Sequence, residues 1–253
     1  MLLRTFQRFL ITAGSVTSLP LHQHDVHTDM RGLAKYLPMV GLFIGGLLLA
    51  LCVTLTKLAI LPAVASTFIA ISWLLLSGGI HFDGLMDTAD GIFSHRSPER
   101  MLEIMRDSRV GNFGVMTGFV VFILKIAGLF SIGNVLPALI LIPAWSRWCE
   151  CFAIGAFPYA RAEGMGKIWH DTMQFPRDLL LAALAPMLAT AFCGLHFGIL
   201  PALLISGSTV IVGIAASFYL SSILRGHTGD TYGAVVELSE AGALVLLTLL
   251  SRV

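Results

Sequence analysis

The chain has 253 residues, of which 56% are hydrophobic and only 12% are charged. Soluble domains carry about 25% charged residues because their surfaces face water, so this composition excludes a soluble fold, and it also excludes a disordered chain. The net charge of +1 argues against nucleic acid as a partner, since nucleic-acid binding requires a clustered basic face. The composition predicts an all-α, polytopic integral membrane bundle that forms one domain over residues 1–253.

The N-terminal segment 1–37 is expected to lie in the cytoplasm or at the membrane interface. Its apolar residues between Leu2 and Ala13 recur at helical spacing, which predicts a short helix lying in the interface. The histidine-rich stretch 22–27 is interpreted as a solvated turn rather than a metal site.

A helix that crosses the membrane needs about 20 apolar residues. We therefore expect about 6–7 transmembrane helices, in the stretches 38–56, 58–79, 110–132, 135–157, 179–224 (two helices) and 234–251. In the last stretch Glu237 and Glu240 stand near the start. In the fourth span Arg147 and Glu150 are interpreted as an ion pair, because unpaired charges are costly in lipid.

Charges in the loops predict the orientation. With seven spans, the segments 1–37, 80–109, 158–178 and 225–233 share one side and hold twelve of the 16 Lys and Arg residues. The positive-inside rule places these segments in the cytoplasm, which predicts a protein of the cell inner (cytoplasmic) membrane. Twelve of the 15 acidic residues lie in the same segments. Since acidic residues do not set topology, their concentration indicates a cytoplasmic-side active site.

The Asp-rich segment 80–109 is the densest polar stretch. Asp83, Asp87 and Asp90 stand at positions i, i+4 and i+7, so they share one face if the helix of the second span continues through them. Three carboxylates this close require a cation, and hard oxygen ligands favour Mg²⁺, Mn²⁺ or Ca²⁺. The spacing predicts a divalent metal site on these aspartates.

A short cytoplasmic helix is predicted after the aspartates, with Ser97 as N-cap and Pro98 in the first turn. Arg106 and Arg109 flank Asp107 directly before the next span. Two interpretations stay open for this group: a surface salt-bridge cluster, or a phosphate clamp with one further metal ligand.

Two glycine-rich loops, 158–166 and 226–233, lie on the same side. Such loops usually connect helices, but their hydroxyls and backbone N–H groups can also bind phosphate or ribose. A metal–aspartate cluster with arginines at a membrane surface favours phosphoryl transfer on a diphosphate carried by a large or amphiphilic molecule.

Two long motifs, 78–91 and 100–111, closely resemble the cobalamin synthase family, whose members are adenosylcobinamide-GDP ribazoletransferases. The stretches 36–45, 159–164 and 228–237 match the family in the same order, so the resemblance covers nearly the whole chain.

The resemblance implies a Mg²⁺-dependent transferase that joins adenosylcobinamide-GDP to α-ribazole or α-ribazole 5′-phosphate and releases GMP, late in vitamin B12 (adenosylcobalamin) synthesis. It implies catalytic roles for Asp83, Asp87, Asp90 and Asp107, the first three also holding the metal. The implied substrate or phosphate contacts are His81, Arg106, Arg109, Arg161, Thr228, Gly229, Asp230 and Glu237.

The general base is left open between Asp107, His81 and His227. One difference from the family concerns the stretch 11–20, which is longer than the usual Thr-Arg-aliphatic-Pro run and lacks its arginine. The resemblance therefore implies no substrate role for this loop. The lipid bilayer is the expected environment, and a homo-oligomer stays open.

Two other classes of membrane protein share part of this pattern. A CDP-alcohol phosphotransferase of phospholipid synthesis also uses an Asp-Gly-led motif, but it requires Ala-Arg soon afterwards, whereas Asp83-Gly84 is followed here by Leu85-Met86-Asp87. A metal or vitamin transporter would place its polar residues near the membrane midplane, whereas most acidic residues here lie at one face.

Overall fold

The computed structural model describes residues 2–21 and 31–250, so the histidine-rich stretch 22–27 lies outside the described residues. The described residues form helices and loops with one isolated backbone bridge, which confirms the all-α class. The elements are α1 (Leu2–Val16), the 3₁₀ helix η1 (Ala34–Tyr36), α2 (Leu37–Lys57), α3 (Pro62–Leu76), α4 (Ile80–Phe93), α5 (Pro98–Ile104), α6 (Asn112–Ser131), α7 (Leu136–Ala156), α8 (Met165–Thr172), α9 (Arg177–Phe197), α10 (Ile199–Leu224) and α11 (Gly229–Leu250).

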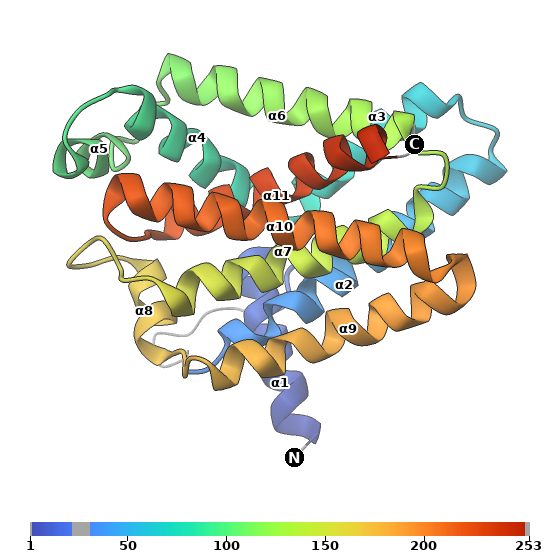
Figure 1. The fold of residues 1–253 in the computed structure, drawn as a ribbon, viewed down its shortest axis with the longest axis horizontal. Coiled ribbons are helices and arrows are strands. Elements are labelled where there is room, and N and C mark those ends of the chain that lie inside the picture. The colour runs from blue at the N-terminus through green and yellow to red at the C-terminus, as the bar shows by residue number, and fades with distance from the viewer. Residues whose placement is uncertain (1, 22–30, 251–253) are drawn as a thin grey trace.

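The long helices run side by side along the long axis of the molecule (Figure 1). Six of them, α2, α6, α7, α9, α10 and α11, are long and apolar enough to cross a membrane, and the bent pair α3–α4 makes up to seven. The prediction of about 6–7 spans is confirmed, and the chain is a multi-pass membrane protein. The stretch 179–224 divides at Gly198, whose φ of +100° suits glycine, and α11 begins earlier than predicted, at Gly229.

The helix of the second span does not continue through the aspartates, so the condition stated for their shared face is not met in that form. Gly78 and Gly79 have φ values of +65° and +69°, and α3 and α4 meet at an angle of 88°. A left-handed conformation at two successive residues ends an α-helix, and glycine adopts it without steric penalty. We call this bend between α3 and α4 the elbow. Ser18 stabilises it, because its hydroxyl donates to the carbonyl of Leu75 at 2.7 Å. The aspartates therefore share a separate helix, α4.

Helix α7 lies at the centre and packs against α2, α9, α10 and α11. Its contact with α2 depends on small residues: a Cβ added at Gly45 would lie 2.5 Å from the carbonyl oxygen of Leu139. Helices in lipid associate by close packing rather than by the hydrophobic effect, so such small residues favour this contact.

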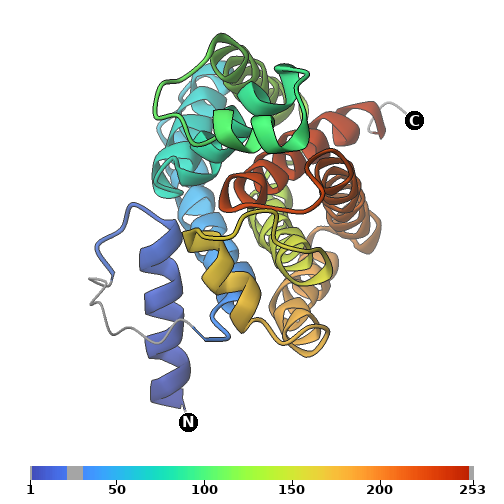
Figure 2. The same ribbon diagram turned by 90° about the vertical axis from the view of Figure 1, so that its left-hand side faces the viewer.

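Helix α1 crosses the direction of the bundle helices in both views (Figures 1 and 2). Ala13 and Val16 are buried in the common core, whereas Phe6 is 58% exposed. The predicted N-terminal helix is thus confirmed. Its apolar exposure and crosswise direction agree with a position in the membrane interface.

Candidate functional site

Four segments that are distant in sequence meet at one end of the bundle: α4, α5, the loop between α7 and α8, and the start of α11 (Figure 2). Two glycines allow α4 and α11 to approach. A Cβ at Gly84 would lie 2.5 Å from the carbonyl oxygen of Asp230, and one at Gly233 would lie 2.7 Å from Cα of His81. The crossing of these helices brings Asp230 to the aspartates of α4.

The carboxylate of Asp87 is the centre of this group. It is repelled by the carboxylates of Asp83, Asp230 and Asp90, in that order of strength, and attracted by the guanidinium of Arg161. Asp83 is exposed and Asp87 is partly buried. The structure therefore brings together residues that the sequence placed in three separate segments. We call Asp83, Asp87, Asp90 and Asp230 the carboxylate cluster.

Arg161 supplies a positive charge to the carboxylate cluster. Its Nη1 lies 2.8 Å from Oδ2 of Asp230, and its Nη2 donates to the carbonyl of Leu102 at 3.4 Å. The side chain is only 11% exposed, and Nε has no partner among the described residues. A guanidinium held so firmly offers a fixed donor fork to an anionic substrate.

Backbone pairing positions this arginine. The amide of Ala160 donates to the carbonyl of His227 at 2.7 Å, and the amide of His227 donates to the carbonyl of Pro158 at 2.9 Å. The two glycine-rich loops, 158–166 and 226–233, are thus joined to each other by backbone hydrogen bonds. This joining explains why Arg161 and Asp230 meet.

Thr228 and Gly229 have different positions. Thr228 is fully buried and acts as the N-cap of α11, since its hydroxyl oxygen accepts from the amide of Thr231 at 3.3 Å. The same hydroxyl donates to Asp230 at 3.3 Å. Gly229 is exposed at the first turn of α11. Thr228 therefore positions Asp230 rather than facing an open pocket itself.

Asp90 has a structural function in addition to its place in the cluster. Its two carboxylate oxygens accept from the backbone amides of Gly111 and Gly114, at 2.7 and 2.8 Å. These amides belong to the N-terminus of α6, where the helix dipole favours a negative charge. Asp90 therefore fastens α4 to α6, and the Gly111-Asn112 start of that helix is the sequence signal for it.

Asp107, Arg106 and Arg109 lie exposed in the loop between α5 and α6. Arg109 donates to Asp107 through its side chain, at 2.7 Å for Nη2, and through its backbone amide at 3.0 Å. These bonds lower the pKa of Asp107 to about 2. A carboxylate with so low a pKa is a weak base, so Asp107 is not suited to accept the proton. Asp107 and Arg109 thus form a surface salt bridge, and the phosphate-clamp interpretation stays a prediction.

His227 is fully buried, and burial lowers its pKa to about 4. Its Nδ1 lies 2.9 Å from the hydroxyl of Thr231 and its Nε2 lies 3.1 Å from the carbonyl of Ser217. With both ring nitrogens occupied, this histidine supports the loop and does not reach a substrate.

His81 and Glu237 are buried inside the bundle. His81 is 3% exposed, and its Nε2 lies 3.6 Å from Oε1 of Glu150, beyond hydrogen-bond distance. Glu237 is 1% exposed and accepts from Nζ of Lys125 at 2.6 Å. Neither side chain has the open position that the resemblance implied for a substrate contact.

The predicted pairing of Arg147 with Glu150 is wrong. Arg147 pairs with Glu240 of α11, which also accepts from Lys125 at 2.6 Å. Glu150 instead lies 3.6 Å from Nε2 of His81 on α4. The pairing depends on helix packing, which the spacing within α7 does not determine.

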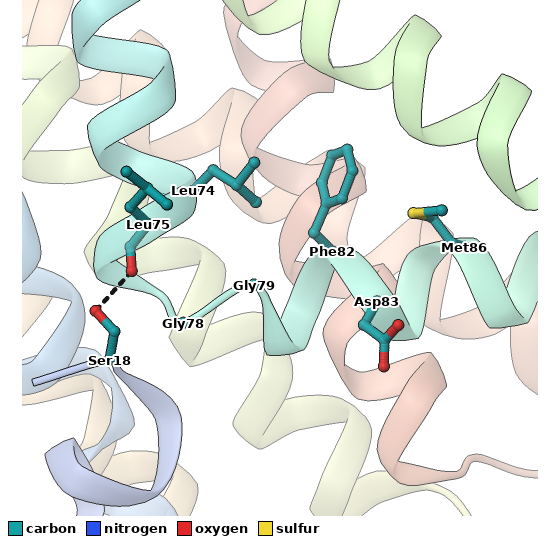
Figure 3. Close-up of a pocket in the computed structure, with 8 residues that line it drawn as sticks. All are labelled: Ser18, Leu74, Leu75, Gly78, Gly79, Phe82, Asp83 and Met86. Carbon is teal, nitrogen blue, oxygen red and sulfur yellow. Dashed lines mark hydrogen bonds between the residues drawn. The ribbon is translucent and has the colours of Figure 1, made fainter. Parts of the chain in front are cut away.

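A cavity of about 420 Å³ lies beside the cluster, at the elbow between α3 and α4 (Figure 3). It is lined by Ser18, Leu74, Leu75, Gly78, Gly79, Phe82, Asp83 and Met86. Asp83 is its only charged lining residue. The stretch 11–20, to which the resemblance carries over no substrate role, thus contributes Ser18 to a cavity next to the cluster.

The carboxylate cluster has the donor chemistry of a divalent metal site. Within residues 2–21 and 31–250, no three His, Cys, Asp or Glu side chains are already arranged to hold a metal ion. The donor chemistry nevertheless fits: several carboxylates around Asp87 repel one another, and carboxylate oxygens are the ligands that Mg²⁺ prefers. Because Asp90 already binds two amides, Asp83, Asp87 and Asp230 are the better candidates.

These features define a multi-pass membrane protein with an acidic site, joined to one arginine, at one end of its bundle. The sequence profile described as cobalamin-5-phosphate synthase matches residues 8–248, and the chain belongs to that family. This membership sets aside the CDP-alcohol phosphotransferase and the transporter.

The names of similar proteins agree with this family. A protein of Thermosynechococcus vestitus is 40% identical over 245 residues, covering 96% of each chain, and one of Desulfitobacterium hafniense is 37% identical over 244 residues, covering 93% of this chain and 94% of the relative. Both are named adenosylcobinamide-GDP ribazoletransferase. No solved structure matches the chain.

Proposed function

We propose that this chain is an adenosylcobinamide-GDP ribazoletransferase that joins adenosylcobinamide-GDP to α-ribazole or α-ribazole 5′-phosphate. The products are adenosylcobalamin, or its 5′-phosphate, and GMP. The observation that carries the proposal is the convergence of Asp83, Asp87, Asp230 and Arg161 at one end of the bundle, in a chain of this family.

In the proposed reaction a ribose hydroxyl of α-ribazole attacks the phosphorus bound to the cobinamide side. A new P–O bond forms, the P–O bond to GMP breaks, and the hydroxyl proton is released. Arg161, fixed by Asp230 and the carbonyl of Leu102, binds the diphosphate oxygens and orients them. Thr228 keeps Asp230 in place at the start of α11.

Asp83, Asp87 and Asp230 would hold Mg²⁺, with Asp90 close by but engaged with α6. When bound, Mg²⁺ would neutralise the charge that develops on the departing GMP. Without a cation, the diphosphate would be repelled by the same carboxylates.

We place the carboxylate cluster and the N-terminus on the cytoplasmic side of the inner membrane. This orientation is supported by the gathering of the predicted cytoplasmic loops at one end of the bundle (Figures 1 and 2) and by their twelve basic residues.

The test uses the purified chain in lipid nanodiscs with Mg²⁺, adenosylcobinamide-GDP and α-ribazole, and measures GMP release. We expect GMP release by the wild type and a decrease of about 100-fold or more in Asp87→Asn, because that change removes a charge at the centre of the cluster. Glu103→Gln is the matched control, since Glu103 is exposed on α5 and pairs with Arg100. Absence of GMP release by the wild type, or full activity of Asp87→Asn, would overturn the proposal.

A further inference from the structure

The cavity at the elbow, of about 420 Å³, is apolar over most of its wall. Figure 3 shows Phe82 and Met86 on one side of α4 and the carboxylate of Asp83 on the other, with Leu74 of α3 pointing toward Phe82. Pockets that hold small organic ligands measure roughly 300–1,000 Å³ and combine an apolar wall with a few polar groups. The elbow cavity therefore has the size and the lining for one small apolar ring system.

The hydrogen-bond donors at the elbow already have partners. The amides of Gly78 and Gly79 donate to carbonyls in the last turn of α3, at 3.0 and 3.2 Å. Ser18 donates to carbonyls of the same turn through its amide, at 3.2 Å, and through its hydroxyl, at 2.7 Å. A ligand rich in polar groups would give up hydrogen bonds to water here without replacement, which costs free energy. The wall thus favours an apolar ligand.

The ring of Phe82 is held in position from the side of α6. It packs edge-on against Phe122, with ring centroids 6.4 Å apart, and a Cβ at Gly118 would lie 3.0 Å from its Cε1. The same ring lines the cavity together with the thioether side chain of Met86. Aromatic ligands gain from contacts with aromatic rings and with methionine sulfur. The lining therefore favours an aromatic ring over an aliphatic group.

Asp83 connects the cavity to the carboxylate cluster. Its side chain lines the cavity in the first turn of α4, and among the neighbouring charges its carboxylate repels that of Asp87 most strongly. The cavity therefore opens beside the cluster rather than at a distant part of the surface. A ligand whose ring fills the cavity would extend its polar part past Asp83 toward Asp87.

We infer that the elbow cavity binds the benzimidazole ring of α-ribazole, a flat aromatic ring that carries two methyl groups. This inference rests on the proposed function, which makes α-ribazole a substrate. With the ring in the cavity, the ribose lies past Asp83, and a ribose hydroxyl reaches the diphosphate at the carboxylate cluster.

The other substrate fits the cavity less well. The carbonyl group of guanine would find no free N–H donor at the elbow, because the donors described above are already bonded within the protein. The corrin ring with its amide side chains is larger than one small ring system and more polar. The elbow cavity therefore selects the base of α-ribazole among the three ring systems of the proposed reaction.

The first experiment measures binding without turnover. Equilibrium dialysis of the full chain in lipid nanodiscs uses α-ribazole alone, with guanosine as a nucleoside that has a polar base. We expect the wild type to bind α-ribazole more tightly than guanosine, and Leu74→Trp, whose larger side chain fills the cavity, to weaken α-ribazole binding about 10-fold or more. If a lipid chain occupies the cavity instead, Leu74→Trp leaves α-ribazole binding unchanged, and the inference is overturned.

The second experiment measures steady-state GMP release. Phe82→Leu and Met86→Ala remove ring and sulfur contacts, so each should raise the KM for α-ribazole about 10-fold while the KM for adenosylcobinamide-GDP stays at the wild-type value. The control Phe119→Leu changes a ring of α6 that is 66% exposed and does not line the cavity, and it should keep both KM values. These two variants also replace Leu74→Trp in the binding experiment if that variant does not fold.

The two experiments separate this inference from the proposed function. Wild-type binding of α-ribazole that the cavity variants weaken, without any GMP release, would overturn the proposed function and support the site. GMP release with an unchanged KM for α-ribazole in the cavity variants would overturn the site alone.

Discussion

Gly84 of α4 lies against the backbone of Asp230 of α11, so closely that a Cβ at position 84 would be 2.5 Å from the carbonyl oxygen of Asp230. This approach joins the Asp-rich helix to the second acidic segment. The main chain of α11 cannot move aside without displacing Asp230 and, with it, Arg161.

We predict that Gly84→Ala destabilises the protein by about 1–3 kcal/mol, because the added methyl group forces the two helices apart. GMP release should fall together with the Tm. Gly46→Ala is the matched control, since a Cβ at Gly46 of α2 would meet nothing within 4 Å and should leave both quantities unchanged. Equal effects of the two variants would contradict the close approach.

The second prediction concerns Asp90, whose replacement should lower the stability of the fold, unlike the replacement of Asp87. Asp90→Ala removes the acceptor of two amides at the start of α6, so the free energy of unfolding should fall by about 2 kcal/mol. Asp90→Asn keeps one acceptor oxygen and should lose less, while Asp87→Asn, which removes a charge repelled by its neighbours, should not lower the Tm. Thermal unfolding of the three variants followed by circular dichroism makes the comparison, and an unchanged Tm in Asp90→Ala would refute the anchoring function.

The sequence predicted the spans well because the hydropathy of a segment depends only on that segment. The spacing of Asp83, Asp87 and Asp90 likewise placed them correctly on one helix. The elbow at Gly78 and Gly79 was not predicted, because a pair of glycines can also lie inside a continuous transmembrane helix.

The ion pairs and the burial of polar residues inside the bundle depend on contacts between helices. Arg147 selects Glu240 rather than Glu150 because α11 lies against α7 at that level, and no periodicity within α7 contains this information. The burial of His81, His227 and Glu237 has the same origin. His81 lies where α4 packs against α11, His227 contacts α10 and Glu237 contacts α6. The sequence motifs contain the residues of the site region. They do not distinguish side chains that face the carboxylate cluster from buried side chains that hold the helices together.

Lys125 provides a third prediction. Its Nζ donates to Glu237 and Glu240, both at 2.6 Å, and all three side chains are buried. Lys125→Met leaves the buried carboxylate of Glu237 without its positive partner, while Glu240 keeps Arg147, and should cost about 3–5 kcal/mol. Adding Glu237→Gln should restore part of the loss because it removes the unpaired charge. Thermal unfolding of the single and double variants tests this, and a double variant less stable than Lys125→Met would contradict the ion-pair explanation.

The last prediction concerns pH. Burial lowers the pKa of His227 from 6.5 to about 4 in the folded chain, whereas in the unfolded chain it returns to about 6.5. Below pH 6.5 the unfolded chain therefore binds a proton that the folded chain does not bind. The contribution of His227 to stability is complete above pH 6.5 and is lost as the pH falls toward about 4, by on the order of 3 kcal/mol in total.

His227→Gln has no such proton, so its Tm should depend less on pH over this range than the wild-type Tm does. Tm measurements on both proteins in detergent, from pH about 7.5 to about 4, compare the slopes, and parallel curves would show that His227 does not carry this pH dependence.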